Sequence, residues 1–369
     1  MQKKIIALAI AAAFSAPAFA DTSNVSVYGV ANVSYDLTNN GLIGTNKVSS
    51  NVSRLGLKGS EDLGSGLSAV WQIESTINID NAGTAGNGLG SRNTFAGLSG
   101  SSGTFIMGRH DTPYKIATRG LDVFADSIAD NRSLMGSTAG GATNAYAGAH
   151  DARLGDVVAY ISPAMNGLTV AIAHVSGAET ASAASNVKGA AWSMAGLYGN
   201  GPLSLSLAYQ TISIGTAGTG TMTSTTFPVA VSANDKLKAW KLGAGYKMDA
   251  VTVNAAYEKT SNTLGGASAA GQSNWYLGGK FNMNADDALK LAYTRAGDMQ
   301  ATSNTGARQW ALGYDHNLSK RTTVYAIYTR LSNDTGSSYG LSTAGSTGGV
   351  AGIANQDPSA WSFGMKHTF

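Results

Sequence analysis

The chain has 369 residues, of which 43% are hydrophobic and only 13% are charged, and its formal net charge of +3 offers no basic excess for nucleic acid. It contains no cysteine, which excludes disulfides, thiol nucleophiles and zinc–thiolate sites. After residue 20 no apolar run reaches the ~18–20 residues of a spanning helix, so a helical membrane protein is excluded as well.

The first 20 residues predict a secretory signal peptide. Lys3 and Lys4 precede an apolar stretch over 5–14, and Ala18-Phe19-Ala20 has the form of a cleavage site. The alternative is a buried N-terminal helix. We expect residues 1–20 to be removed, which places residues 21–369 outside the cytosol as a single domain.

Residues 21–369 repeat one unit, a strand of about ten residues followed by a turn or loop rich in Gly, Ser, Asn and Thr. In the stretch 203–210, Leu203, Leu205, Leu207 and Tyr209 alternate with polar or small residues, as a strand with one apolar and one polar face requires. Seven short turns and eight long connections separate sixteen such strands. The long connections cover roughly 38–46, 79–90, 110–155, 177–187, 213–234, 261–271, 297–305 and 332–358.

This pattern predicts an all-β fold, a transmembrane antiparallel β-barrel with short turns at one rim and long loops at the other. A soluble sandwich or barrel would point its apolar faces inward, and sixteen strands enclose more volume than these side chains fill. We therefore expect apolar side chains to face lipid, and the alternating last strand, 361–369, to close the sheet against the first. Two aromatic girdles are expected, one from Trp240, Trp275 and Trp310 near long loops and one from Tyr246, Phe281 and Tyr314 near short turns.

Several stretches carry a family resemblance. They are "VSVYGVANVSYD" at 25–36, "SRLGLKGSEDLGSGLSAVWQIE" at 53–74, "SRNTFAGLSGSSGTFIMGRHDTPY" at 91–114 and "VAYISPAMNGLTVAIAH" at 158–174. With these stretches and its last strand, the chain resembles the general diffusion porins of Gram-negative bacteria, of the neisserial and β-proteobacterial type. The resemblance covers essentially all of residues 21–369.

The resemblance implies a homotrimer in the outer membrane, in contact with its lipid and lipopolysaccharide. Each barrel would hold a water-filled channel for passive diffusion of small ions and hydrophilic solutes. The third long loop, 110–155, would fold inward and narrow the channel. The last strand resembles the signal that the barrel-assembly machinery reads, which would involve Ser362, Gly364 and Phe369.

Related porins set basic residues on the barrel wall against acidic residues of the inward loop. Leu55 and Leu57 on the outer face would turn Arg54 toward the lumen. By position the basic wall is carried over to Arg54, Arg92, Arg153 and then Arg109, with Lys115 and Arg132 on the loop. Arg109 shares the parity of Phe105 and Met107, which could turn it outward. Each arginine has an alternative interpretation, a rim residue that merely pairs with a loop carboxylate.

The loop stretch "LDVFADSIAD", 121–130, is expected to form a short helix with Asp122 as its N-cap. Asp122, Asp126 and Asp130 are spaced by four and would line one side of it, forming the acidic wall of the constriction. A basic wall facing them predicts modest anion selectivity.

No catalytic site, metal site or cofactor is expected. The five histidines are scattered, and only His110 and His150 lie near the same loop. Glycine-rich stretches such as "LGAGYK" lack the strand–turn–helix setting of a phosphate loop. The alternatives to a passive channel are a substrate-selective channel and, less well supported, an adhesin or enzyme built on a barrel.

Overall fold

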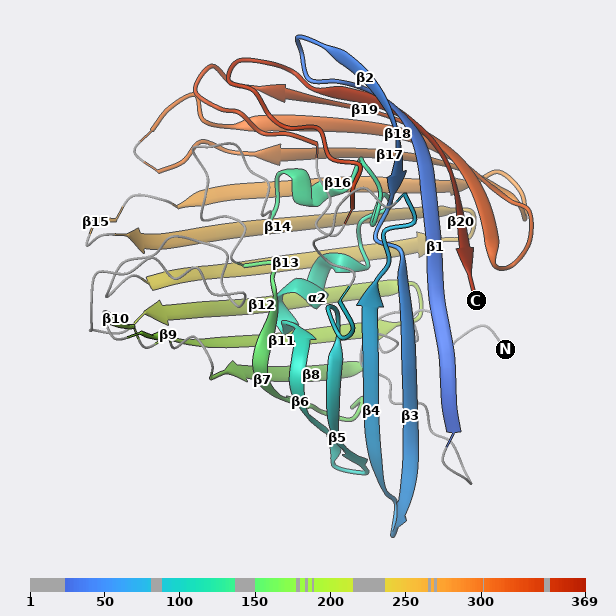
Figure 1. Cartoon of the computed structure of the whole chain (residues 1–369), viewed down its shortest axis with the longest axis vertical. Helices are drawn as coiled ribbons and strands as arrows, with labels where there is room; N and C mark the ends of the chain where they lie inside the picture. Colours follow the sequence, from blue (N-terminus) through green and yellow to red (C-terminus); the bar gives the residue numbers. More distant parts are fainter. Residues whose placement is uncertain are drawn as a thin grey trace.

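The computed structural model describes residues 24–80, 88–136, 150–176, 180–182, 185–187, 189–214, 236–264, 267–268, 271–300, 302–341 and 346–369. The predicted signal peptide lies outside the described residues. Within them the chain forms one antiparallel β-barrel (Figure 1). None of the described helices is long and apolar enough to cross a membrane.

Sixteen strands make the wall of the barrel, and each pairs with its sequence neighbours in antiparallel register. The first eight are β1 (Asn24–Asn39), β3 (Arg54–Gly64), β4 (Leu67–Thr76), β5 (Thr94–Gly100), β6 (Gly103–Asp111), β7 (Arg153–Ile161), β8 (Leu168–Val175) and β11 (Gly189–Asn200). The other eight are β12 (Leu203–Ile214), β13 (Lys236–Met248), β14 (Val251–Leu264), β16 (Gln272–Asn282), β17 (Asp287–Ala296), β18 (Ala307–Asn317), β19 (Thr322–Asn333) and β20 (Ser359–Thr368).

Four shorter strands belong to the loops. They are β2 (Gly44–Ser50), which pairs with the upper part of β1, then β9 (Thr180–Ser182), β10 (Ser185–Val187) and β15 (Ala267–Ser268). The barrel closes where β1 pairs with β20, from Val30 opposite Thr368 to Asn39 opposite Ser359. The predicted sixteen-stranded barrel and its closure between the first and last strands are confirmed.

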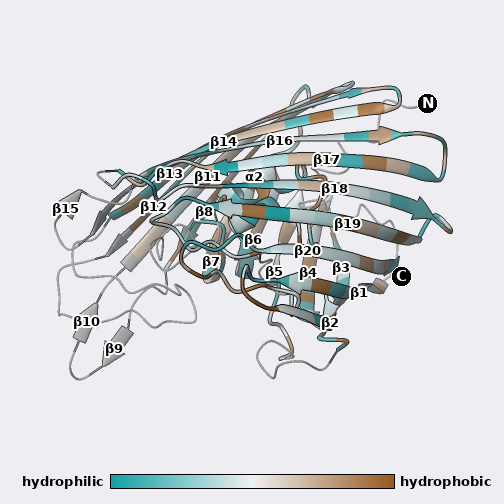
Figure 2. Cartoon of the chain, turned by 90° about the horizontal axis from the view of Figure 1, so that it is seen from above, coloured by the Kyte–Doolittle hydropathy of each residue, from teal (hydrophilic) through white to brown (hydrophobic). Residues whose placement is uncertain are grey.

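The side-chain pattern of the strands is that of a sheet with lipid outside and polar groups inside. Along β13, Leu242, Ala244 and Tyr246 are exposed on the outer face, while Lys241 is buried on the inner one. Bands of hydrophobic and hydrophilic residues alternate along the strands in Figure 2. On β20 the outward residues Trp361, Phe363 and Met365 are exposed, as their alternation predicts.

The long loop 110–155 enters the barrel, where it begins with the helix α2 (Pro113–Arg119). Figures 1 and 2 both place α2 within the ring of strands, against the inner faces of β11, β12 and β13. Thr112 caps this helix, since its hydroxyl accepts from the Lys115 amide at 3.3 Å, and Pro113 occupies the first turn.

The helix predicted over 121–130 does not form. That stretch consists of turns, followed by a short 3₁₀ helix, η1 (Asn131–Ser133). One carboxylate oxygen of Asp122 accepts from the amide of Phe124 at 2.9 Å. The other accepts at 2.9 Å from the amide of Asn131, which is nine residues farther along the chain. An aspartate that bonds backbone amides in this way favours a turn over a continuing helix.

One of the apolar clusters of the barrel lies between this loop and one side of the wall. Phe124, Ala129 and Met135 of the loop form a cluster with Ala256, Tyr276, Ala292, Ala311 and Ile327 of β14 and β16–β19. Small residues on the inner face of these strands leave room for the loop. Gly313 illustrates this, because a Cβ there would lie 2.6 Å from the Phe124 ring.

Candidate functional site

Charged side chains gather where the inward loop faces the wall formed by β1 and β3–β7. Glu74 of β4 is the centre of one group on that wall. Its carboxylate accepts from Arg92 Nε at 2.6 Å and from the Tyr28 hydroxyl at 3.0 Å, and Arg54 Nε lies 3.9 Å away. Two arginines therefore share one carboxylate, which leaves this part of the wall with a positive charge.

A second group lies at the end of β6 and the start of β7. Asp111 pairs with Arg153 at 3.0 Å and with Lys115 at 2.7 Å, and Arg153 also donates to the Asn93 side chain at 2.7 Å. Burial lowers the pKa of Lys115 to about 7, although the Asp111 carboxylate acts in the opposite direction. Lys115 is thus a basic group whose charge depends on pH near neutrality.

Arg109 is half-buried on β6. Its Nε donates to the carbonyl of Ser91 at 3.1 Å, and it forms no ion pair with any residue that the structure describes. The register of the β6–β7 ladder shifts between Gly108 and His110, so the strand is irregular beside it. Arg109 remains a predicted member of the basic wall.

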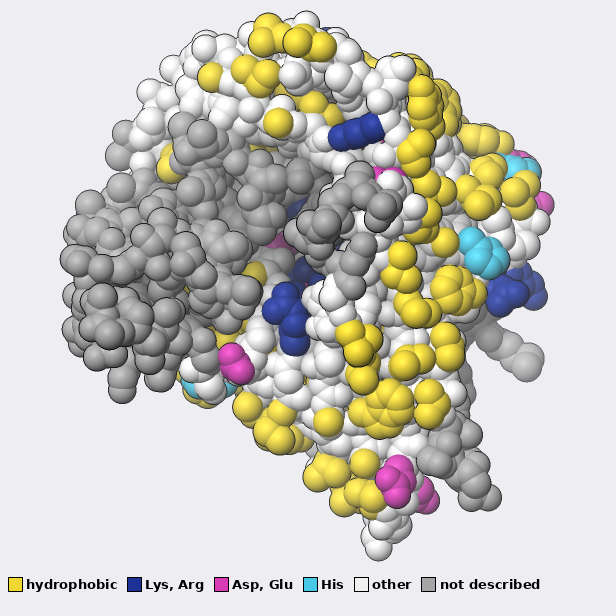
Figure 3. All heavy atoms as spheres, viewed as in Figure 1, with side chains coloured by type: hydrophobic (Ala, Val, Ile, Leu, Met, Phe, Trp, Pro, Cys, Tyr) yellow, Lys and Arg dark blue, Asp and Glu magenta, His cyan; other side chains and the backbone are white. Residues whose placement is uncertain are grey.

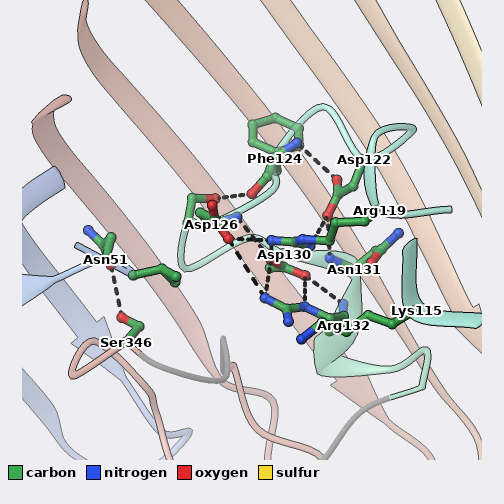
Figure 4. Close-up of polar contacts among 12 residues, drawn as sticks. Asn51, Lys115, Arg119, Asp122, Phe124, Asp126, Asp130, Asn131, Arg132 and Ser346 are labelled. Carbon is green, nitrogen blue, oxygen red and sulfur yellow. Dashed lines mark hydrogen bonds and ion pairs between the residues drawn. The ribbon is translucent and has the colours of Figure 1, made fainter. Parts of the chain in front are cut away.

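The loop carries its own charged cluster, shown in Figure 4. Arg119 donates to Asp126 at 2.6 Å and to Asp130 at 2.7 Å, and Arg132 pairs with Asp130 at 3.1 Å. Asp122 is 4.0 Å from Arg119. The loop therefore brings the three predicted acids together through its turns, because the backbone at Asp126 adopts a left-handed conformation with φ +61°.

The exposures within this cluster decide which charges meet solvent. The side chains of Asp122 and Asp130 are 1% and 0% exposed, whereas those of Arg119 and Asp126 are each 22% exposed. Two of the three predicted acids are thus buried and paired within the loop. Asp126 is the predicted acid that meets the basic wall, at Arg54, and an acidic wall formed by Asp122, Asp126 and Asp130 stays a prediction.

The loop carboxylates differ in their pKa. Burial and the neighbouring Asp130 raise the pKa of Asp122 to about 6. Burial would also raise the pKa of Asp126 and Asp130, but the guanidinium of Arg119 outweighs it and holds both below their ordinary values. Asp126 and Asp130 are therefore ionised throughout the physiological range, and Asp122 gains a proton in mild acid.

Two contacts join the loop to the wall. Arg54 Nη1 lies 3.4 Å from Asp126 Oδ2, and the Asn32 side chain donates to the Asp126 carbonyl at 3.1 Å. The space-filling view in Figure 3 shows basic side chains in the hollowed centre of this face and hydrophobic ones over the outer surface of the wall. The predicted basic residues Arg54, Arg92, Arg153, Lys115 and Arg132 are thus brought into one region.

The base of the loop is anchored by a buried cluster that sequence reasoning missed. Lys241 pairs with Asp151 and, at 3.4 Å, with Glu258, whose carboxylate also accepts from the Tyr114 hydroxyl at 2.8 Å. The Gly136 amide donates to the same carboxylate at 2.8 Å. Both ends of the loop therefore attach to β13 and β14. The sequence feature that could have predicted this cluster is the position of Lys241 and Glu258 on the polar faces of their strands.

The predicted assembly-signal residues lie on β20 and at the chain end. Ser362 is buried on the inner face, and Gly364 faces the Tyr325 ring, which a Cβ would approach to 2.3 Å. Phe369 exchanges backbone hydrogen bonds with Gly29 at 3.0 and 3.2 Å, while its ring is exposed. Their role as a signal remains a prediction. Within the described residues no group of His, Cys, Asp and Glu could hold a metal ion.

Comparison with known proteins agrees with this architecture. A family model described as Gram-negative porin matches residues 7–336. The major outer membrane protein P.IA of Neisseria meningitidis serogroup C is 39% identical over 75 residues, which are 20% of this chain and 19% of that protein. The matched part thus spans about a fifth of the length of such curated relatives.

Two solved structures resemble the whole barrel. An anion-selective porin from Comamonas acidovorans has a TM-score of 0.79 and 25% sequence identity, covering 94% of this chain and 100% of that one. The OmpT outer membrane protein of Vibrio cholerae in its trimer form has a TM-score of 0.69 at 14% identity, covering 95% of this chain and 100% of that one. The second likeness concerns the fold alone.

Proposed function

The chain belongs to the Gram-negative porin family and is an outer-membrane protein, and from this premise we propose that its barrel is a passive diffusion channel that favours anions. The observation that carries the proposal is the arrangement of charge at the constriction. Seven basic residues gather there, namely Arg54, Arg92, Arg109, Lys115, Arg119, Arg132 and Arg153, against five acidic ones, Glu74, Asp111, Asp122, Asp126 and Asp130. Seven minus five gives a net charge of +2.

The placement of these charges strengthens the preference. Asp122 and Asp130 are covered by protein, while Arg54 on the wall and Arg119 on the loop are each 22% exposed, with Asp126 between them. An ion in the passage therefore meets more positive than negative charge. Selection in pores of this kind depends on such rings of charge and on pore diameter.

Further basic groups line the lumen below the constriction. Lys290 of β17 lies over the Phe124 ring, 5.0 Å from its centroid, and pairs with Asp315 at 2.7 Å. Lys58 of β3 lies over the Tyr28 ring at 5.4 Å, and Lys366 of β20 lies within electrostatic range of Asp126, Arg54, Lys290 and Asp315. These lysines extend the positive potential along the lumen.

A substrate-selective channel is supported less well. A sugar-selective channel would present aromatic faces along its lumen, but the lumen-side tyrosines of the described strands bond to protein. Tyr28 donates to Glu74, Tyr276 accepts from the Val123 amide at 2.9 Å, and Tyr325 donates to Asn32 at 2.8 Å. We infer passive diffusion of small anions and hydrophilic solutes.

We also infer that the protein is a channel without enzymatic activity. The histidines contact separate elements: His174 packs against Trp192 with the rings tilted by 58°, His316 lies 2.7 Å from Asp287, and His367 bonds Thr322 at 2.9 Å. His110 bonds the Asp111 carbonyl, and His150 packs on Tyr114. We further propose a homotrimer, by analogy with the trimer form of the similarly folded Vibrio protein.

The experiment that tests the proposal is a bilayer recording with the full-length protein. We expect open channels with ohmic conductance and, under a salt gradient, a zero-current potential of the sign that anion preference gives. Cation preference would overturn the assignment of the basic constriction. An absence of conductance, from protein that is folded by circular dichroism, would overturn the channel proposal itself.

A further inference from the structure

The wall of the barrel is irregular beside the inward loop. The C-terminal half of β1 pairs with β2 and its N-terminal half pairs with β3, so residues 51–53 lie between the two ladders. Val52 there has φ +57°, in the left-handed region that β-branched residues avoid. Across this break the Asn51 amide donates to the Asn32 carbonyl at 2.7 Å. The break thus brings together two asparagines whose side chains are both buried.

The hydroxyl of Tyr325 on β19 links the two asparagine side chains. It donates to Asn32 Oδ1 at 2.8 Å and accepts from Asn51 Nδ2 at 3.2 Å. The aromatic ring lies over Gly364 of β20, where a Cβ would overlap it, and packs against the apolar cluster of Phe124. Gly364 therefore gives the ring the space in which its hydroxyl reaches the asparagines.

Each asparagine also holds one of the long loops. Asn32 Nδ2 donates to the carbonyl of Asp126 in the inward loop at 3.1 Å. Asn51 Oδ1 accepts from the hydroxyl of Ser346 in the last long loop at 3.0 Å, and these two residues also form an isolated β-bridge. Figure 4 shows the contact between Asn51 and Ser346 on the same side of the loop cluster as Asp126. The side chains of Asn32, Tyr325 and Asn51 thus form a hydrogen-bonded chain between the two loops, which we call the relay.

One end of the relay lies at the constriction. Asp126 is the loop acid that meets the wall, with its Oδ2 3.4 Å from Arg54 Nη1. Its backbone has φ +61°, a conformation that persists only where its surroundings support it. The hydrogen bond from Asn32 provides part of that support. The relay therefore acts on the position of Asp126 relative to Arg54, and so on the charge that an ion meets.

The other end of the relay is fixed independently of Tyr325. The Thr347 amide donates to the Ser50 carbonyl at 3.0 Å, which holds the last loop against β2. Asn51 Nδ2 has a second acceptor, Ser34 Oγ, at 2.7 Å. Removal of the Tyr325 hydroxyl therefore breaks the relay in its middle and leaves the last loop attached.

We propose that Tyr325 is a positioning residue of the constriction, which couples the last long loop to the inward loop through Asn32 and Asn51. The relay holds Asp126 beside Arg54, and a displacement of the last loop at Ser346 reaches Asp126 through it. The last loop thereby influences ion preference from a distance. This inference rests on the proposed function of the barrel as an ion-selective channel.

The first test measures detachment of the inward loop with a thiol reporter in the full-length protein. The chain has no cysteine, so Ala129→Cys, at a position that is 3% exposed within the Phe124 cluster, provides a single thiol. We expect Tyr325→Phe to raise the labelling rate of this cysteine by a polar thiol reagent roughly fivefold, as the loss of one neutral hydrogen bond from a docked loop implies.

The matched control for the thiol test is Tyr257→Phe. It also removes one tyrosine hydroxyl, which bonds Ser273 at 3.1 Å on the outer face of the barrel, and it should leave the labelling rate unchanged. Equal labelling rates in Tyr325→Phe and in this control would overturn the proposal.

The second test asks whether the last loop acts through the relay. Ser346→Ala removes the hydroxyl that donates to Asn51 and changes no residue of the constriction. We expect Ser346→Ala and Tyr325→Phe each to lower the anion-to-cation permeability ratio about twofold, because a looser Asp126 exposes more of its negative charge. The double variant should match Tyr325→Phe alone, since members of one network are not additive. Additive effects would show that the last loop acts by another route, and would overturn the relay.

The two readouts distinguish failure of this inference from failure of the proposed function. If the wild type prefers cations but Tyr325→Phe still speeds labelling, the relay stands and the anion assignment of the channel falls. If the wild type prefers anions and Tyr325→Phe changes neither labelling nor the zero-current potential, the relay alone falls. Tyr325→Phe should unfold at about the temperature of Tyr257→Phe. If it does not fold, Ser346→Ala still decides: unchanged labelling and potential in that variant would overturn the relay.

Discussion

The sharpest test of the basic constriction is to remove three arginines from the wall. Arg54→Gln, Arg92→Gln and Arg153→Gln remove three charges and keep polar side chains at these positions. The local balance falls from seven basic and five acidic residues to four and five, or from +2 to −1. Glu74 loses both of its arginine partners, so its carboxylate becomes an attractive site for cations.

The size of the effect follows from the charge change. A unit charge about 7 Å from the ion path contributes about 0.6 kcal/mol in water, and screening at about 0.1 M salt roughly halves this. Because the term has opposite signs for anions and cations, each charge alters their ratio by about 0.6 kcal/mol, or roughly threefold. Three charges should lower the anion-to-cation permeability ratio roughly twentyfold, enough to invert a modest anion preference.

The assay is the zero-current potential across a planar bilayer under a salt gradient. The control is Lys238→Gln/Arg295→Gln/Arg308→Gln, which removes three basic residues from the outer face of the barrel and should leave the potential unchanged. If the wall variant keeps the anion preference of the wild type, the reasoning is wrong and the filter lies on the loop, at Arg119 and Arg132. If the control variant shifts as much as the wall variant, the effect comes from overall charge rather than from the constriction.

Three further predictions concern the loop. Anion preference should weaken as the pH rises through about 7, because Lys115 then loses its proton, and this step should be absent from the zero-current potentials of Lys115→Gln. Lys241→Met leaves Asp151 and Glu258 buried without their counter-ion, so the attachment of the loop should weaken by about 3 kcal/mol. In limited proteolysis the loop should then be cleaved faster, while the barrel stays folded. Phe124→Ala should cost the loop about 3 kcal/mol of packing and increase current noise in single-channel traces, whereas quiet traces would contradict its packing role.

Much of the fold could be predicted because the alternation of apolar and polar residues within a single strand shows which side chains face lipid and which face the lumen. The alternation of Trp361, Phe363 and Met365 with Ser362 and Gly364 gives the face of each residue without knowledge of its neighbours. In the same way, because Leu55 and Leu57 face outward, the side chain of Arg54 was expected to face the lumen. The number of strands could be predicted from the regular alternation of short turns and long loops along the chain.

The constriction could be predicted less well because its contacts depend on the path of the loop. The sequence suggested a helix capped by Asp122, but the stronger start signal, Thr112 before Pro113, placed the helix ten residues earlier. Asp122 then caps turns instead, and the loop winds so that Arg119 reaches Asp126 and Asp130. No spacing rule contains that geometry, since it is set by packing against β14 and β16–β19.

The attachments of the loop determine which strands it covers and which strands it faces. Its ends are held at β13 and β14 by Lys241 and Glu258, and its middle packs through Phe124 on β17 and β18. Its far point, Asp126, touches the wall at Arg54 and Asn32. The loop therefore lies against the strands with small apolar inner residues and faces the strands with arginines. At this contact the charges of the loop and of the wall lie close together, so both would act on the same passing ion. Removing charge from either surface alone should therefore change the anion preference that we propose.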